Sequence, residues 1–167
     1  MITRLVAISA IFWASFATVS AAPYDSQIDA TAIAKLLSIG FANAPANFSS
    51  IRGTARPTLG GIEQYAALTW PDHTHFRDCK IGHFGPTTDL RETYMYECVS
   101  TARRLPMEKL FELARREIRI ILPVSYAGDA PKNFAETWTR RGHPDVHLYA
   151  YSQADGQHYL VRLSKEL

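Results

Sequence analysis

The two cysteines, Cys79 and Cys98, constrain the fold of this chain more than any other feature of its sequence. Both lie in runs where apolar and polar residues alternate, which is the pattern of a strand with one buried face. A hairpin centred on Thr88 and Asp89 would place the cysteines directly opposite each other, close enough for a disulfide. The same register gives three further facing pairs: Lys80 with Glu97, Ile81 with Tyr96 and His83 with Tyr94. An opposite-charge pair and aromatic pairs therefore support this hairpin.

The N-terminal segment has the layout of a secretory signal peptide. Arg4 precedes an apolar run over residues 5–19, and small residues follow as far as Ala22. This run of 15 residues is shorter than the roughly 20 that a helix needs to cross a bilayer. We therefore expect residues 1–21 to be removed as a signal peptide, and we expect no stable membrane anchor after cleavage.

Export would determine the state of the cysteines. A secreted or periplasmic chain folds in an oxidising compartment, where two cysteines normally pair. A disulfide between Cys79 and Cys98 would close a loop of about 20 residues and stabilise the fold by on the order of 3 kcal/mol. Two buried free thiols are the alternative.

Length and charge limit the possible functions. The remaining residues, 22–167, are of the size of one domain and are expected to form a single α+β domain. Loss of Arg4, the only charged side chain of the signal peptide, lowers the formal net charge from +2 to +1. This balance is too even to capture nucleic acid by electrostatics, so we expect no nucleic-acid partner.

Two segments have the spacing of amphipathic helices. Ser26 and Asp29 form a capping-box pattern ahead of apolar residues at helical spacing, which predicts a helix over residues 26–39. A single apolar stripe between Pro106 and Pro123 predicts a second helix. We expect both stripes to pack on a sheet.

The other segments have a period of two or none. Predicted strands are residues 62–70, the two cysteine-bearing strands, and residues 134–140, 146–152 and 157–164. Residues 41–61 are expected to be a long connection with at most a short strand near residues 48–52. The predicted fold class is α+β, with two helices packed on one side of an antiparallel sheet, the order α-βββ-α-βββ and one disulfide.

The last two strands are joined by Asp155 and Gly156, which form a typical hairpin turn. With these residues at the centre of the turn, residue i faces residue 311 − i, so Leu148 faces Leu163 on the side expected to be buried. The opposite side carries a second set of pairs: Tyr149 with Arg162 and Tyr151 with Leu160, with His158 at the margin.

This second side is the candidate binding face, made of Tyr149, Tyr151, His158 and Arg162. Tyrosine and arginine contribute much of the binding energy of protein interfaces when they are desolvated. Ordinary half-buried sheet surface, covered by residues 41–61, is the alternative. We expect a secreted or periplasmic, non-enzymatic binding protein whose partner is another envelope or secreted protein.

Two other functions stay open. His73 and His75 lie two apart on one strand face and could share a metal ion with help from Asp72 or from a partner chain, which would indicate a periplasmic metal-binding protein. A small hydrolase would need carboxylates that converge from different strands. The chain has no Gly-x-Ser-x-Gly elbow, and paired cysteines leave no thiolate. We therefore name no catalytic residue, no metal ligand and no cofactor.

Overall fold

The computed structural model describes residue 28 and residues 30–59, 61–86 and 91–167. The signal peptide expected over residues 1–21 and the turn expected at Thr88 and Asp89 lie outside these residues. The described elements, in which η denotes a 3-10 helix, follow in this order: α1 (Ala30–Asn43), η1 (Ala44–Ala46), η2 (Ser49–Ile51), β1 (Arg52–Leu59), β2 (Ile62–Ala67), β3 (Phe76–Phe84), β4 (Thr93–Ser100), α2 (Met107–Ile121), β5 (Ala127–Gly128), β6 (Ala135–Thr139), β7 (Asp145–Gln153) and β8 (Gly156–Glu166).

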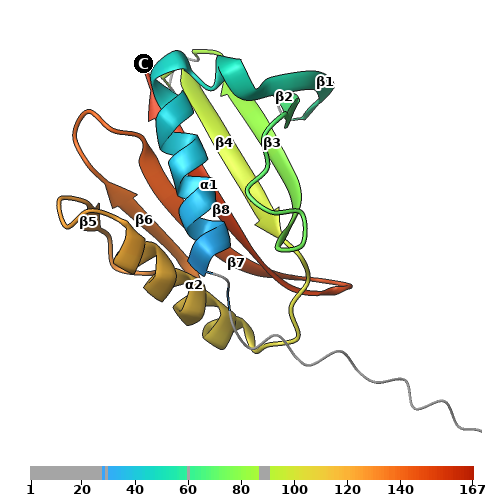
Figure 1. Ribbon diagram of the computed structural model, residues 1–167, viewed down its shortest axis with the longest axis vertical. Coiled ribbons are helices and arrows are strands. Elements are labelled where there is room, and N and C mark those ends of the chain that lie inside the picture. Colours follow the sequence, from blue (N-terminus) through green and yellow to red (C-terminus); the bar gives the residue numbers. More distant parts are fainter. Residues whose placement is uncertain (1–27, 29, 60, 87–90) are drawn as a thin grey trace, which may run out of the picture.

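The described strands form one antiparallel sheet of eight, in the order β1-β2-β3-β4-β8-β7-β6-β5. Each half of the chain is a helix followed by four strands, and the halves meet where β4 pairs with β8. Figure 1 shows α1 and α2 in front of this sheet. The α+β class is as predicted, but the order α-βββ-α-βββ is wrong because each half has one more strand.

β1 and β5 are the strands that the sequence pattern did not reveal. β1 is an edge strand that contains Gly53 and Pro57, and its pairing with β2 is irregular at two places. Glycine, proline and bulges interrupt the alternation by which a strand is recognised. β5 has only two residues, too few for any period.

The β3–β4 hairpin has the predicted register. Cys79 pairs with Cys98, and the three other predicted pairs are also present. A disulfide joins the two cysteines, whose Cα atoms are 4.2 Å apart and whose side chains are fully buried. The disulfide therefore links β3 to β4 inside the hydrophobic core.

The two helices pack against β8 and against each other. The predicted stripe of α2 buries four side chains: Leu110, Phe111, Ala114 and Ile118. The predicted capping residues Ser26 and Asp29 lie outside the described residues, and α1 continues through Gly40, which we expected to end it. A Cβ atom on Gly40 would come within 2.6 Å of Leu163 on β8. Gly40 therefore allows α1 to approach the sheet closely.

The β7–β8 hairpin differs from its predicted register by two residues. Gln153 pairs with Gly156, so the turn is formed by Ala154 and Asp155, and Leu148 faces Val161 instead of Leu163. Gly156, with a φ of 140°, begins β8 and lies beside the backbone of Arg103, which pairs with Gln157. Because a shift of two keeps every side chain on its face, the pairs change but the faces do not.

Candidate functional site

The face of the sheet opposite the helices carries three of the four predicted binding residues. On β8, Val161 and Leu163 are buried and Leu163 reaches Gly40 of α1, so the alternating residue Arg162 points to the other face. Tyr149 and Tyr151 of β7 lie half-buried on that face as well. We call the residues on this side of β3, β4, β7 and β8 the strand face.

His158, the fourth predicted residue, is fully buried. Its Nδ1 atom lies 2.9 Å from the Ser100 carbonyl oxygen, and its Nε2 atom lies 2.8 Å from Asp155 Oδ1. The ring therefore holds the β7–β8 turn against the end of β4, and it is not available for a ligand.

Glu97 lies at the centre of the strand face and is only 3% exposed. Lys80 Nζ is 3.0 Å from its Oε1, and Arg162 binds its Oε2 at 2.7 Å. The Arg162 guanidinium also lies 5.7 Å from the centre of the Tyr149 ring. The cation and the ring that we expected to contact a partner are thus engaged within the face itself.

Two further ion pairs also hold charged side chains of this face against each other. Arg56 binds Asp78 at 2.8 Å, and Arg77 binds Asp155 at 2.9 Å. Opposite charges held this close compensate each other, and removal from water would add a desolvation cost to any complex. The strand face is therefore preorganised, but few of its charges are free for recognition.

A serine–imidazole pair lies at one end of the strand face. Ser164 Oγ is 2.7 Å from His147 Nε2, and Thr137 Oγ1 is 3.0 Å from His147 Nδ1. This is the arrangement of a nucleophile, a base and an orienting group. Sequence analysis missed it because the three residues come from three different strands, β6, β7 and β8.

The electrostatics of this pair oppose catalysis. Burial, and then the positive charge of Arg162, lower the pKa of His147 to about 4. The imidazolium that forms when a base takes the serine proton is therefore unfavourable, and the Thr137 hydroxyl carries no charge to stabilise it. Ser164 also lies within β8, whose backbone is paired on both sides, so its amide is not available to bind an oxyanion.

A cleft of about 850 Å³ lies at the end of the molecule where α1 and β8 finish. We call it the end cleft. Its walls come from four separate parts of the chain: Phe41, Ala44 and Pro45; Pro123 and Tyr126; Arg140 and Gly142 to Asp145; and Ser164 to Glu166. Ligand pockets typically have volumes of roughly 300–1,000 Å³, so the end cleft is of a size that holds a small organic molecule.

Aromatic rings form the apolar part of the end cleft. The Tyr126 ring is buried, and its hydroxyl donates to the Pro144 carbonyl oxygen at 3.1 Å. The Phe41 ring lies 5.9 Å from Tyr126 and the His143 ring 6.4 Å from it, measured between ring centres. A planar or apolar ligand would therefore meet a rigid aromatic surface.

The charges of the end cleft differ from those of the strand face. Arg140 and Asp145 form no ion pair and no side-chain hydrogen bond with any described residue, and Lys165 donates only to the neutral oxygens of Asn47 and Pro45. Burial, and then the negative charges of Glu166 and Asp129, raise the pKa of Asp145. The end cleft thus presents uncompensated charges of both signs beside its rings.

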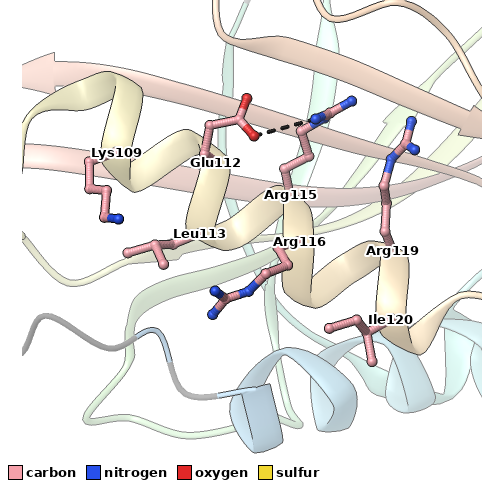
Figure 2. A pocket seen from close by; sticks show the side chains of 7 residues that line it. All are labelled: Lys109, Glu112, Leu113, Arg115, Arg116, Arg119 and Ile120. Atoms are coloured by element: carbon pink, nitrogen blue, oxygen red, sulfur yellow. Dashed lines mark hydrogen bonds and ion pairs between the residues drawn. The ribbon is translucent and has the colours of Figure 1, made fainter.

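A second, shallower hollow of about 440 Å³ follows the outer surface of α2. Figure 2 shows its side chains, with Glu112, Arg115 and Arg119 on one side of the helix and the remaining four on the other. Arg115 and Arg119 both bind the buried carboxylate of Glu136, and Arg116 binds Glu117. These ion pairs leave the hollow little net positive charge with which to bind an anion.

The histidines considered as metal ligands lie in the turn directly before β3 and not, as expected, on a strand face. The His73 ring stacks on Trp70 with 4.5 Å between ring centres, and His75 Nδ1 lies 3.2 Å from Asp72 Oδ2. Within the described residues, no group of three or more His, Cys, Asp or Glu side chains is placed to hold a metal ion.

Comparison with known proteins does not assign a function to the strand face or to the end cleft. No protein-family model matches the chain, and neither the curated proteins nor the solved structures include a significant match. None of the described helices is both long enough and apolar enough to cross a membrane.

The residues of the end cleft were not among the predicted site residues. Tyr126, Arg140 and Lys165 lie in three segments that meet only in the folded chain. The one local signal was the turn 140–144, where arginine, glycine, histidine and proline occur together between two strands.

Proposed function

We propose that the protein is an exported binding protein that holds a small organic molecule in the end cleft. The observation that carries the proposal is a cavity of about 850 Å³ whose aromatic wall is flanked by the unpaired charges of Arg140 and Asp145. A concave, largely apolar pocket with a few converging polar groups is the usual form of a small-molecule site.

The end cleft supports recognition better than the strand face, which we first considered for a partner protein. On the strand face, Arg162 is already bound to Glu97 and stacked against Tyr149. A partner would have to compete with these contacts, whereas a ligand in the end cleft would supply partners that Arg140 and Asp145 lack.

Binding without turnover is proposed because the serine–imidazole pair beside the end cleft is a poor catalyst. His147, with its pKa lowered to about 4, is far from the range near neutral pH in which a general base is most effective. Ser164 therefore serves better as a hydrogen-bonding group than as a nucleophile.

Export is proposed from the N-terminal pattern together with the buried disulfide, a bond that persists in oxidising compartments. Mass spectrometry of the chain expressed with its own N-terminus tests it. We expect a mature chain that begins at Ala22 and cysteines that react with alkylating agents only after reduction. An intact Met1 together with two reactive thiols would contradict export.

Binding in the end cleft can be tested by NMR with a set of small organic acids, amines and amino acids. We expect at least one of them to shift the amide signals of residues 140–145 and 164–166 in a saturable way. The amides of residues 77–80 and 149–151, on the strand face, serve as the internal control. Saturable shifts confined to the strand face, or to neither region, would overturn the proposal.

A further inference from the structure

His83, at the end of β3, lies between two carboxylates from different parts of the sheet. Its Nδ1 atom is 3.1 Å from Glu63 Oε2 on β2, and its Nε2 atom is 3.0 Å from Glu92 Oε1, directly before β4. The His83 side chain is 19% exposed. The ring therefore bridges the strands on its two sides.

Both contacts are hydrogen bonds only when the ring carries two N–H groups. Neutral imidazole has one donor and one acceptor nitrogen, whereas imidazolium has two donors. A neutral His83 would direct a lone pair at one of the two carboxylates, so one contact would become repulsive.

The carboxylates themselves are held as acceptors. Tyr65 donates its hydroxyl to Glu63 at 3.3 Å, and Tyr94 donates its hydroxyl to Glu92 at 2.8 Å. The pKa of Glu63 is lowered first by its hydrogen bond with His83, and the pKa of Glu92 first by its hydrogen bond with Tyr94. Both groups thus remain ionised throughout the range in which histidines titrate.

The other groups that face the ring come from β1 and β4. The Tyr94 ring stacks on His83 with 4.3 Å between ring centres, and the Arg52 guanidinium lies 4.6 Å from Tyr65 and 5.9 Å from Tyr94. Lys165, which faces Tyr94 from β8, is bound to Asn47 and Pro45. Two carboxylates therefore face one guanidinium and one imidazole, a cluster that balances when the imidazole is protonated.

We propose that His83 is a pH-sensitive link that fastens the edge of the sheet: in its protonated form it joins β2 to the start of β4, and in its neutral form it releases one of the two carboxylates. The region affected is the β1–β2 hairpin, the irregularly paired edge of the sheet. His158 also has both nitrogens near acceptors, but these are Ser100 at the end of β4 and Asp155 in the β7–β8 turn, so it does not contact the edge hairpin.

The direction of the pH dependence follows because only the protonated His83 ring can donate to both carboxylates. The link is complete while the ring is protonated and is lost when the ring gives up its proton as the pH rises, so the edge hairpin becomes easier to open. Because ion pairs at this degree of exposure contribute little, we expect the opening equilibrium to change by no more than about five-fold.

NMR on the full chain tests this link. Spectra and hydrogen exchange are recorded from pH 5 to 8, and we expect the ring nitrogens of His83 to be doubly protonated where the link is complete and neutral where it is lost. We also expect the hydrogen-exchange protection of the β2 amides, corrected for the intrinsic effect of pH, to fall by up to about five-fold as the ring loses its proton.

Two variants separate the link from general effects of pH. H83Q should remove the pH dependence of β2 protection, whereas H143Q, at an exposed histidine in the end cleft, should retain it. A ring that stays in one form from pH 5 to 8 in the unmodified protein would overturn the proposal, as would the same pH dependence in H83Q. The test is made without any ligand, so its outcome is independent of binding in the end cleft.

Discussion

The strand face and the end cleft both combine aromatic rings with charges, yet they use the charges differently. On the strand face, Glu97 is buried and bound by Lys80 and Arg162. In the end cleft, Arg140 and Asp145 have no charged partner among the described residues. Charges that neutralise one another stabilise the fold, whereas charges left without a partner are available to a ligand.

This difference shows why residue type alone is a weak guide to a binding surface. Tyr149 and Arg162 are of the types that occur in interfaces, but the Arg162 guanidinium is bound by Glu97 and lies over the Tyr149 ring. The partners of a side chain, which depend on the folded structure, determine whether it serves stability or recognition.

The largest expected effect of a substitution is on the strand face. Replacing Glu97 by Gln removes a buried negative charge and leaves Lys80 and Arg162 without their anionic partner, so the free energy of unfolding should fall by about 2–3 kcal/mol. Urea denaturation at pH 7 measures this loss. The matched change Glu166→Gln, at an exposed carboxylate of the end cleft, should alter the stability by less than about 0.5 kcal/mol. Equal losses would remove the distinction between the two regions.

An effect of similar size, on acidification, concerns His147, where the two regions meet. Its pKa is about 4 in the folded chain, against an ordinary value of 6.5. As the pH falls, the unfolded chain therefore takes up this proton first, and stability that is complete above pH 6.5 is lost progressively down to about pH 4. Since each pKa unit corresponds to about 1.4 kcal/mol, we expect the loss from this group to be on the order of 3 kcal/mol.

Thermal or urea denaturation of the protein and of H147Q between pH 4 and 7 isolates this contribution, because the other titrating groups are common to both. The variant should lose less stability on acidification than the unmodified protein. Parallel curves would show that His147 is not held in its neutral form.

A smaller effect is expected at Tyr149. Replacement by Ala removes the ring beneath the Arg162 guanidinium and should lower the free energy of unfolding by about 1 kcal/mol, measured by urea denaturation. Tyr149→Phe keeps the ring and should have almost no effect. Neither variant should change binding in the end cleft. Loss of that binding in Tyr149→Ala alone would return the strand face to consideration as the recognition surface.

The sequence determined the β3–β4 hairpin well because several constraints agreed. The disulfide, the pair formed by Lys80 and Glu97, and two pairs that each include a tyrosine all required the same register. The β7–β8 hairpin had only an Asp-Gly pair to place its turn. The contact of Gly156 with the backbone of Arg103, which is distant in the sequence, accompanies a register two residues away.

The end cleft was beyond the reach of sequence patterns for a similar reason. Phe41 lies in the last turn of α1, Tyr126 follows α2, and Lys165 lies near the end of β8. No local sequence pattern marks any of the three as a site residue. Only the packing of α1 against β8, permitted by Gly40, brings them to one cavity. Local periodicity predicts elements and faces, but it does not predict which element ends will meet.

The most direct test of the account compares two neighbouring arginines. Arg140 lines the end cleft and Arg141, the next residue, does not. Both R140Q and R141Q should unfold within about 0.5 kcal/mol of the unmodified protein. For an organic acid that shifts the end-cleft amides, titration calorimetry should show about ten-fold weaker binding to R140Q, as expected for a lost charge-assisted hydrogen bond, and unchanged binding to R141Q. Equal affinity in both variants would contradict the claim that the unpaired charges of the end cleft serve recognition.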